Sequence, residues 1–139
     1  MGAMQPDSTA GSLLRLQDRF DLMDLAARAA RTFDTNDAGG YADCFIEEGI
    51  YESPRIGLRA EGRAQLADMC RSRGGEDLHY CTNFEVELRG DSATVRTALL
   101  LSSRNGPLVN TTGHYISQCV RTPLGWRYSH KVSYLDRRG

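Results

Sequence analysis

The stretch Ser12–Phe45, SLLRLQDRFDLMDLAARAARTFDTNDAGGYADCF, decides the fold class because it opens the chain with a long helical pattern. Apolar side chains recur in it at steps of three and four, which predicts an amphipathic helix of about six turns. We expect Ser12 to cap this helix. The run from Asp34 to Asp37 should end it, since such side chains compete for their own backbone bonds. The stripe expected to face the core is Leu13, Leu16, Phe20, Met23, Ala27, Ala30 and Phe33 or Asp34.

Shorter elements, and then long strands, are predicted after this helix. The short ones are a helix from Asp37 or Ala38 to Phe45, strands over Gly49–Ser53 and Ile56–Glu61, and a third helix over Arg63–Arg73. The long β-type runs are Leu78–Leu88, Ser92–Ser103, Leu108–Arg121 and Trp126–Leu135. Turn signals separate these runs at hairpin spacing, at Gly90-Asp91, Asn105-Gly106 and Pro123-Leu124-Gly125.

This order of elements, helices first and an antiparallel meander afterwards, indicates the α+β class. We expect a cone-shaped α+β barrel, in which the N-terminal helices pack on a strongly curved, mainly antiparallel sheet that encloses a pocket. With 139 residues, one domain is expected, over residues 12–136. Residues 1–11 are predicted to be a loose tail that begins with a cloning remnant.

The composition excludes several classes of function. Seventeen basic residues balance 18 acidic ones without a basic cluster, which disfavours nucleic-acid binding. No apolar run approaches the roughly 20 residues that span a bilayer, and no secretion signal is visible. We therefore expect a cytoplasmic protein that binds no membrane. Its four cysteines should be reduced and mostly buried, and they lack the spacing of a metal site with the three histidines.

Asp34 and His79 are the first candidates for chemistry. Asp34 ends the first helix, where the helix dipole disfavours a carboxylate; the alternative is an ordinary helix-ending Asp open to water. His79 opens a long strand, and alternation places it with Cys81 on one face and Phe84 and Val86 on the other. A bulge, or a sheet that is apolar on both faces, is then required. The alternative role for His79 is a polar strand end at an edge.

An Asp and a His brought together form a useful catalytic unit. The carboxylate fixes the imidazole tautomer, and the neutral imidazole then removes a proton from carbon or oxygen. Such a pair suits elimination, isomerisation and cyclisation. Six tyrosines are available to donate a hydrogen bond to a developing oxyanion, although strand tyrosines often serve packing. No nucleophile elbow, Walker loop or dinucleotide motif is present.

Three stretches of the chain carry a resemblance to a known family. Leu16–Phe45 has a helix that ends in an aromatic residue plus Asp, a turn and a short helix ending in Phe. His79–Asn83 leads into FEVELRGDSATV, and Arg121–Tyr128 is RTPLGWRY. In this order the three stretches resemble the opening, the strand opening and the terminal hairpin of the SnoaL-like family of the nuclear transport factor 2-like superfamily.

The resemblance implies a catalytic pair of Asp34 and His79. These positions match the dyad of scytalone dehydratase, hexachlorocyclohexane dehydrochlorinase and bile-acid 7α-dehydratase. Gly113-His114 is similar to the position of a further histidine in scytalone dehydratase, so His114 is a third catalytic candidate. The dehydratases place a tyrosine near the Asp, where this chain has Phe33; we expect Tyr51 to act as the donor instead. The expected substrate-binding residues are Tyr51, Phe33, Tyr115 and Cys81.

The expected function is that of a cofactor-independent, dehydratase-like lyase or isomerase. Its substrate would be a hydrophobic cyclic, polyketide-like or steroid-like small molecule, turned over by Asp–His acid–base catalysis. One alternative is a polyketide cyclase or pericyclic catalyst that works mainly by pocket shape. Another is a non-catalytic protein, either a dioxygenase small-subunit-like partner or a ligand-binding protein. The exposed sheet face is expected to form a homodimer, with a homotrimer as the alternative.

Overall fold

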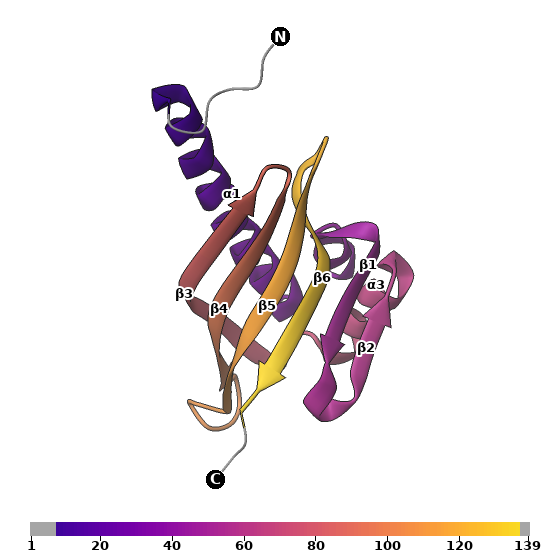
Figure 1. Ribbon diagram of the computed structural model, residues 1–139. Helices are drawn as coiled ribbons and strands as arrows, with labels where there is room; N and C mark the ends of the chain where they lie inside the picture. Colours follow the sequence, from indigo (N-terminus) through magenta and orange to yellow (C-terminus); the bar gives the residue numbers. More distant parts are fainter. Residues whose placement is uncertain (1–7, 137–139) are drawn as a thin grey trace.

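The computed structural model describes residues 8–136, which form helices packed on one six-stranded sheet (Figure 1). The helices are α1 (Thr9–Asp34), α2 (Ala38–Ala42) and α3 (Arg63–Arg73), with a short 3-10 helix η1 (Pro54–Ile56). The strands are β1 (Phe45–Ser53), β2 (Leu58–Glu61), β3 (Asp77–Arg89), β4 (Ser92–Ser103), β5 (Thr111–Thr122) and β6 (Gly125–Leu135).

The sheet has the strand order β2-β1-β6-β5-β4-β3. Strands β3 to β6 form the predicted antiparallel meander, and β1 joins its free edge in parallel with β6. The C-terminal half of α1 crosses one face of the sheet, while its N-terminal half projects past the sheet edge (Figure 1). The predicted α+β class is confirmed. The sheet is curled around α1, but its end strands β2 and β3 do not pair, so it does not close into a barrel.

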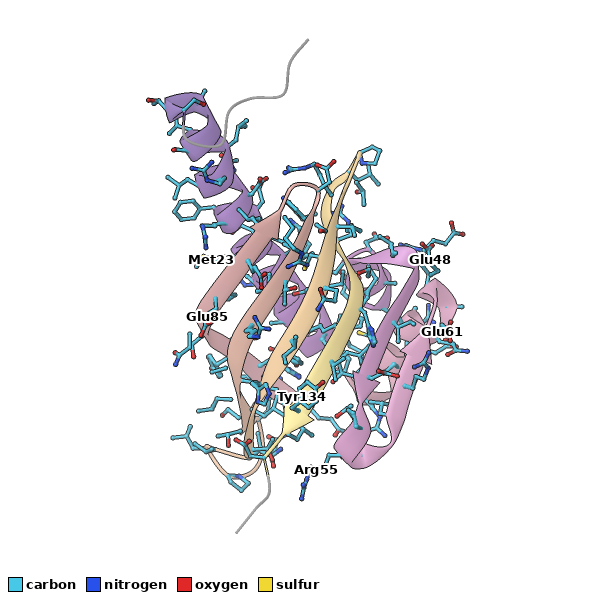
Figure 2. The ribbon with its side chains drawn as sticks, viewed as in Figure 1. Met23, Glu48, Arg55, Glu61, Glu85 and Tyr134 are labelled. Atoms are coloured by element: carbon cyan, nitrogen blue, oxygen red, sulfur yellow. The ribbon has the colours of Figure 1, made fainter. Side chains whose placement is uncertain are left out.

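Helix α1 begins earlier than predicted and buries a different face. Ser8, rather than Ser12, is the N-cap and accepts a hydrogen bond from the Gly11 amide at 2.9 Å. The predicted stripe is wrong for most of its length, because Leu13, Leu16, Phe20, Met23 and Ala27 are exposed. Met23, which is labelled in Figure 2, borders a hollow between α1 and β3. The buried stripe is Asp18, Leu22, Leu25, Ala26, Ala29 and Asp34.

A polar clamp joins the projecting half of α1 to the β5–β6 hairpin. Asp18 accepts two hydrogen bonds from the Arg121 guanidinium, at 2.7 and 2.8 Å, and one from the Trp126 indole at 3.0 Å. The guanidinium also lies 4.6 Å from the centre of the Trp126 ring. Arg121 and its hydrogen bond hold the pKa of the buried Asp18 carboxyl below its usual value. The clamp fixes the direction of α1 across the sheet.

Two register shifts decide which side chains face α1. In β3 the pairing with β4 shifts between Thr82 and Glu85, and Asn83 adopts a left-handed conformation with φ of 55°. Of the two arrangements that the sequence left open, a bulge or a sheet that is apolar on both faces, the structure has the bulge. In β6 the pairing with β5 shifts as well, because Ser129 is an extra residue between the partners of Gln118 and Cys119. The consequences for the site are described below.

The core fills the space between α1, α2, α3 and the concave face of the sheet. Its largest fully buried side chains include Leu22, Leu25, Phe45 and Leu66. The cysteines are free thiols, buried at positions 44, 70 and 119 and half-buried at position 81, as the sequence predicts. None of the described helices is both long and apolar enough to cross a membrane.

Candidate active site

Asp34 and His79 meet at the point where α1 ends and β3 begins. The Asp34 carboxylate spans both parts of His79: Oδ2 accepts the backbone N–H at 2.8 Å, and Oδ1 lies 2.6 Å from the ring Nδ1. Both side chains are largely buried, with 10% and 16% of their surfaces exposed. Because an ionised carboxylate only accepts hydrogen bonds, this contact places the ring proton on Nδ1. Nε2 is then the basic nitrogen, and no group within residues 8–136 hydrogen-bonds to it.

The chain around Asp34 holds the carboxylate in place. The Asn36 amide donates to the Gly74 carbonyl at 2.9 Å, and the Gly75 amide donates to the Phe33 carbonyl at 3.1 Å. A Cβ at Gly74 would lie 2.6 Å from the Phe33 carbonyl oxygen, so only glycine allows this approach. From the other side, Arg104 donates to the Asp34 carbonyl at 2.9 Å. The end of α1 is therefore tied to the end of α3 and to the start of β3.

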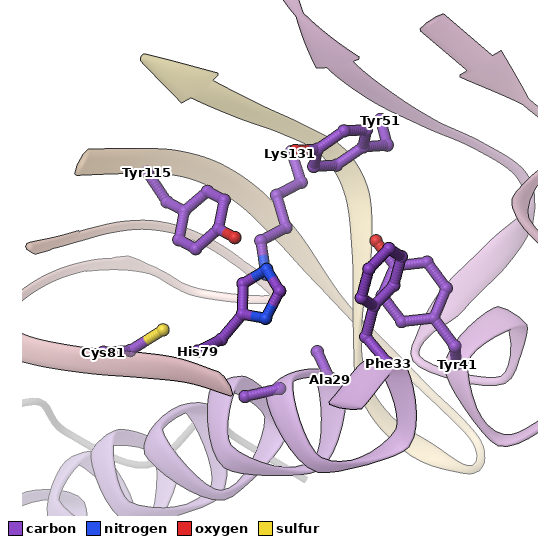
Figure 3. Close-up of a pocket in the computed structure, with 9 residues that line it drawn as sticks. Ala29, Phe33, Tyr41, Tyr51, His79, Cys81, Tyr115 and Lys131 are labelled. Carbon is purple, nitrogen blue, oxygen red and sulfur yellow. The ribbon is translucent and has the colours of Figure 1, made fainter. Parts of the chain in front are cut away.

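An inner cavity of about 30 Å³ lies beside the His79 ring (Figure 3). Its lining comes from α1, α2 and four strands, so that residues far apart in the sequence converge on it. The lining residues are Ala29, Ala30, Phe33, Tyr41, Tyr51, His79, Cys81, Tyr115 and Lys131. Phe33 packs edge-on against the His79 ring, with the ring centroids 5.3 Å apart. A cavity of this volume has room for about one or two water molecules, or for one functional group of a larger molecule.

Two larger hollows adjoin the inner cavity. One, of about 560 Å³, shares Phe33, Tyr51, His79 and Tyr115 with it and continues along aliphatic side chains such as Leu99. The other, of about 550 Å³, lies between α1 and β3 and shares Ala30, His79 and Cys81 with it. His79 is common to all three spaces. A ligand in either hollow can therefore present one group to the inner cavity.

The tyrosines of the inner cavity are suited to hydrogen-bond donation. Burial raises the pKa of Tyr41 and of Tyr115 well above the ordinary tyrosine value. It also raises the pKa of Tyr51. All three phenols therefore keep their protons at neutral pH and can donate to an oxygen in the cavity.

Lys131 brings an amine into the same cavity, although it is only 5% exposed. Its Nζ lies 4.1 Å from the centre of the Tyr115 ring and 4.6 Å from that of Tyr128. No described carboxylate pairs with it. Burial lowers the pKa of the Lys131 ammonium, because desolvation disfavours the charged form. In Figure 3 the side chain reaches from β6 toward His79.

The structure brings most of the predicted site residues together. Asp34 and His79 are in contact, and Phe33, Tyr51, Tyr115 and Cys81 line the inner cavity with His79. His114 is not brought to them. It is exposed on the opposite face of the sheet, where its ring stacks on Tyr134 with centroids 5.0 Å apart. The reason is alternation: Tyr115 points inward, so its neighbour His114 points outward.

Sequence reasoning missed Tyr41 and Lys131 as site residues. Simple alternation from Tyr128 assigns His130 to the inner face and Lys131 to the outer one. The extra residue Ser129 reverses this, so that Lys131 faces the cavity. His130 pairs instead with Glu52 outside it, at 2.9 Å. The signal available in the sequence was that Lys131 is the one lysine of the chain and lies within a largely apolar strand.

The site shows no set of metal ligands. Within residues 8–136 no three His, Cys, Asp or Glu side chains lie close enough together to hold a metal ion. The inner cavity presents one imidazole, one amine, one thiol and three phenols. These groups can remove a proton, donate hydrogen bonds and, in the case of the amine, attack an electrophile.

Comparisons with solved structures find the same fold in bacterial proteins. A Mycobacterium tuberculosis protein of unknown function is 26% identical in sequence and has a TM-score of 0.83. The match covers 99% of this chain and 79% of that protein's chain. A nuclear transport factor 2-like protein with a cystatin-like fold, from Novosphingobium aromaticivorans, is 23% identical, with coverages of 97% and 94% and a TM-score of 0.82. No curated protein matches the sequence.

A second Novosphingobium aromaticivorans protein, provisionally named a scytalone dehydratase, is 16% identical, with coverages of 88% and 87% and a TM-score of 0.75. At this identity the likeness shows the fold alone. The family model of the SnoaL-like domain matches residues 14–132, which is most of the chain. The resemblance seen in the sequence is thus confirmed, and the chain belongs to the SnoaL-like family.

Proposed function

We propose that the protein is a cofactor-independent lyase or isomerase that removes a proton from a hydrophobic cyclic small molecule. The observation that carries the proposal is the double contact of Asp34 with the backbone and ring of His79 beside a cavity. This contact leaves Nε2 of His79 as a positioned base. A histidine base that is held in this way by a carboxylate favours proton abstraction from the bound molecule.

In the proposed reaction His79 takes a proton from a carbon atom of the bound substrate. Asp34 then stabilises the imidazolium that forms, because its carboxylate lies 2.6 Å from Nδ1. The electrons of the broken C–H bond move toward an adjacent carbonyl, or expel a leaving group on the next carbon. Returning the proton to another carbon gives isomerisation, and losing the leaving group gives elimination.

The phenols that surround His79 supply the second half of the reaction. Tyr51, the donor expected from the sequence, lines both the inner cavity and the hollow of about 560 Å³. Tyr41 and Tyr115 also face the inner cavity. A phenol donating to a developing oxyanion is worth about 3–4 kcal/mol when it is preorganised. These side chains therefore replace the tyrosine that the dehydratases place near their Asp.

The shapes of the spaces support this substrate class. The inner cavity admits one small polar group. The hollow beside it combines aliphatic side chains, such as Leu58 and Leu99, with the charged side chains of Arg73, Glu76 and Asp77 at its rim. A cyclic molecule fits this division, with its apolar ring in the hollow and its carbonyl next to His79.

Turnover of a panel of cyclic ketones tests the proposal. The panel contains β-hydroxy ketones for elimination and β,γ-unsaturated ketones for isomerisation. Asp34→Asn and His79→Gln should each lower kcat at least about 1000-fold, because general-base catalysis contributes 10²–10⁴-fold and its tautomer control is also lost.

His130→Gln is the matched control, since it changes a histidine that pairs with Glu52 outside the cavity. It should keep nearly full turnover. Small losses in both dyad variants, with large losses when the hollow is filled by Leu99→Trp, would support a catalyst that works by shape. Tight binding of ketones with no turnover would support a ligand-binding protein.

We also propose that two copies associate through the outer face of the sheet. This face carries apolar side chains on β3 to β6, which we call the apolar patch: Tyr80, Leu100, Ile116, Val132 and Tyr134. Tyr80 lies opposite Leu100, and Ile116 lies opposite Val132, with Ala98 and His114 in the row between these two pairs. Tyr80 and Tyr134 are 51% and 41% exposed, and Figure 2 shows Tyr134 on the face away from α1. Apolar side chains gathered on an open sheet face are typical of an interaction surface.

A further inference from the structure

The Lys131 side chain has no structural task that explains its burial. A buried ammonium is costly unless a carboxylate pairs with it. Here no carboxylate or hydrogen-bond acceptor within residues 8–136 contacts Nζ, and its only described contacts are the faces of Tyr115 and Tyr128. The side chain nevertheless enters the cavity that holds His79. A costly group that points into a candidate active site is best explained by its chemistry.

We propose that Lys131 is the carbonyl-binding residue of this site and forms an imine with a ketone or aldehyde group that enters the inner cavity. The inference rests on the proposed function and deepens it, since it names the substrate class as carbonyl compounds. A volume of about 30 Å³ suits a carbonyl carbon with its oxygen. It does not suit a whole ring, which stays in the adjoining hollow.

The step balances without any added reagent. The Nζ lone pair attacks the carbonyl carbon, the C–O π electrons move to oxygen, and proton transfer gives a carbinolamine. Loss of water from this adduct breaks the C–O bond and forms the C=N bond, so that amine plus carbonyl gives imine plus water. A neutral amine is required, and burial favours the neutral form by lowering the pKa of Lys131.

The groups around Lys131 Nζ can stabilise the protonated imine that forms next. A protonated imine is positively charged, and the faces of Tyr115 and Tyr128 stabilise a cation. This iminium also draws electrons from the neighbouring carbon, so His79 Nε2 removes its proton and leaves an enamine. Protonation or loss of a leaving group follows, and water then hydrolyses the imine and restores both residues. Lys131 thus supplies the electron-withdrawing iminium, and His79 acts as the base.

The sequence makes the experiment unusually clear, because Lys131 is the one lysine of the chain. The full-length protein is incubated with cyclohexanone and sodium cyanoborohydride, or with acetylacetone, which forms a stable enaminone without a reductant. Peptide mass spectrometry then locates the adduct. We expect labelling at Lys131, none at that position in Lys131→Met or Lys131→Arg, and any background only at the α-amine.

The labelling rate of the wild type should rise with pH and level off below the ordinary lysine pKa of about 10.4. Several titratable groups around Nζ bear on this profile. They are His79 and Cys81 from β3, Tyr51 from β1, Tyr41 from α2, Tyr115 and Cys119 from β5, Tyr128 from β6, and Cys44 from the turn after α2. The phenols whose pKa burial raises keep their protons throughout this range.

Failure of this inference is distinguishable from failure of the proposed function. His79→Gln should still form the Lys131 adduct while losing turnover. If the folded wild type is not labelled although the urea-unfolded chain is, the imine is refuted. Substantial turnover by Lys131→Arg would also refute it, since a guanidinium supplies charge but forms no imine. Labelling with full turnover in His79→Gln would instead overturn the proposed base.

Discussion

At the scale of single residues, the site is made of groups that would each destabilise the fold if left alone. Asp34 places a carboxylate at the C-terminal end of α1, where the helix dipole is unfavourable. Two contacts from His79 compensate for this. Lys131 has no such compensation beyond two aromatic faces. This difference leads to a prediction about stability that needs no substrate.

Lys131→Met should stabilise the protein at pH 7 by about 1–4 kcal/mol, the range found when buried charged groups are replaced by apolar ones. Because the folded-state pKa of Lys131 is lowered, the unfolded chain binds the extra proton between that value and about 10.4. The stability of the wild type relative to the variant therefore rises with pH in this window. Below this pH window, the wild type is less stable than Lys131→Met by a constant amount, which is the largest difference at any pH.

Urea unfolding of both proteins at pH 6, 7.5 and 9 measures this difference. Lys131→Arg is the control, since arginine stays charged, and it should be less stable than the wild type. A Lys131→Met variant that is less stable than the wild type at every pH would mean that the ammonium has a stabilising partner.

At the scale of elements, the site depends on where strands break their alternation and where α1 is held. The bulge at Asn83 lets His79 and Cys81 share the concave face with Phe84 and Val86. In β6 the extra residue Ser129 lets Lys131 share the concave face with Tyr128. Each shift changes the face of every side chain that follows.

Much of this level was predictable from the sequence. The limits of α3 and β4 agree with the predicted Arg63–Arg73 and Ser92–Ser103, since Gly and turn residues bound both elements. The bulge in β3 is one of the two arrangements that two apolar sets of opposite parity allow, the other being a sheet that is apolar on both faces. The register shift at Ser129 has no such signal in the sequence, because each face of β6 has both polar and apolar residues. The place of Lys131 could therefore not be predicted.

Which face of α1 is buried could also not be predicted from the sequence pattern. Leu16, Phe20 and Met23 form a stripe of large apolar residues, yet all three are exposed. Leu16 and Phe20 belong to the N-terminal half of the helix, which projects past the sheet edge. The face that contacts the sheet has small residues such as Ala26 and Ala29, which allow a close approach. Periodicity shows which residues share a face, but not which face the sheet covers.

The clamp on α1 gives a prediction at this scale. Asp18→Asn should destabilise the protein by about 1–3 kcal/mol, the usual value of hydrogen bonds to a charged group. Since the pKa of Asp18 is lowered in the folded state, its contribution is present above the unfolded value of about 3.9 and is lost as pH falls through the folded value. Trp126 fluorescence follows the unfolding.

Asp24→Asn is the matched control, because Asp24 is exposed on the same helix. It should leave both stability and its acid dependence nearly unchanged. Equal effects of the two substitutions would show that helix charge, and not the clamp, determines the loss.

At the scale of the whole molecule, the two faces of the curled sheet serve separate purposes. The concave face, closed by α1, encloses the candidate active site, and the outer face presents the apolar patch that we propose for association. The exposed His114 and Tyr134 lie on this outer face. Chemistry and assembly can therefore be tested independently.

Ile116→Glu tests the association. It places a charge in the apolar patch, so light scattering should show a dimer for the wild type and a monomer for the variant. Arg55→Glu, on the exposed helix η1 away from that patch, should remain dimeric. A monomeric wild type at micromolar concentration would contradict the proposal.

The central claim, that His79 held by Asp34 removes a proton from carbon, is tested most directly by deuterium exchange. The ketone that the wild type turns over fastest is incubated in D₂O, and deuterium at its carbon positions is followed by NMR. The account predicts rapid incorporation next to the carbonyl with the wild type and with His130→Gln, and a loss of at least about 1000-fold with His79→Gln and Asp34→Asn. Incorporation by His79→Gln at the rate of the wild type would contradict it.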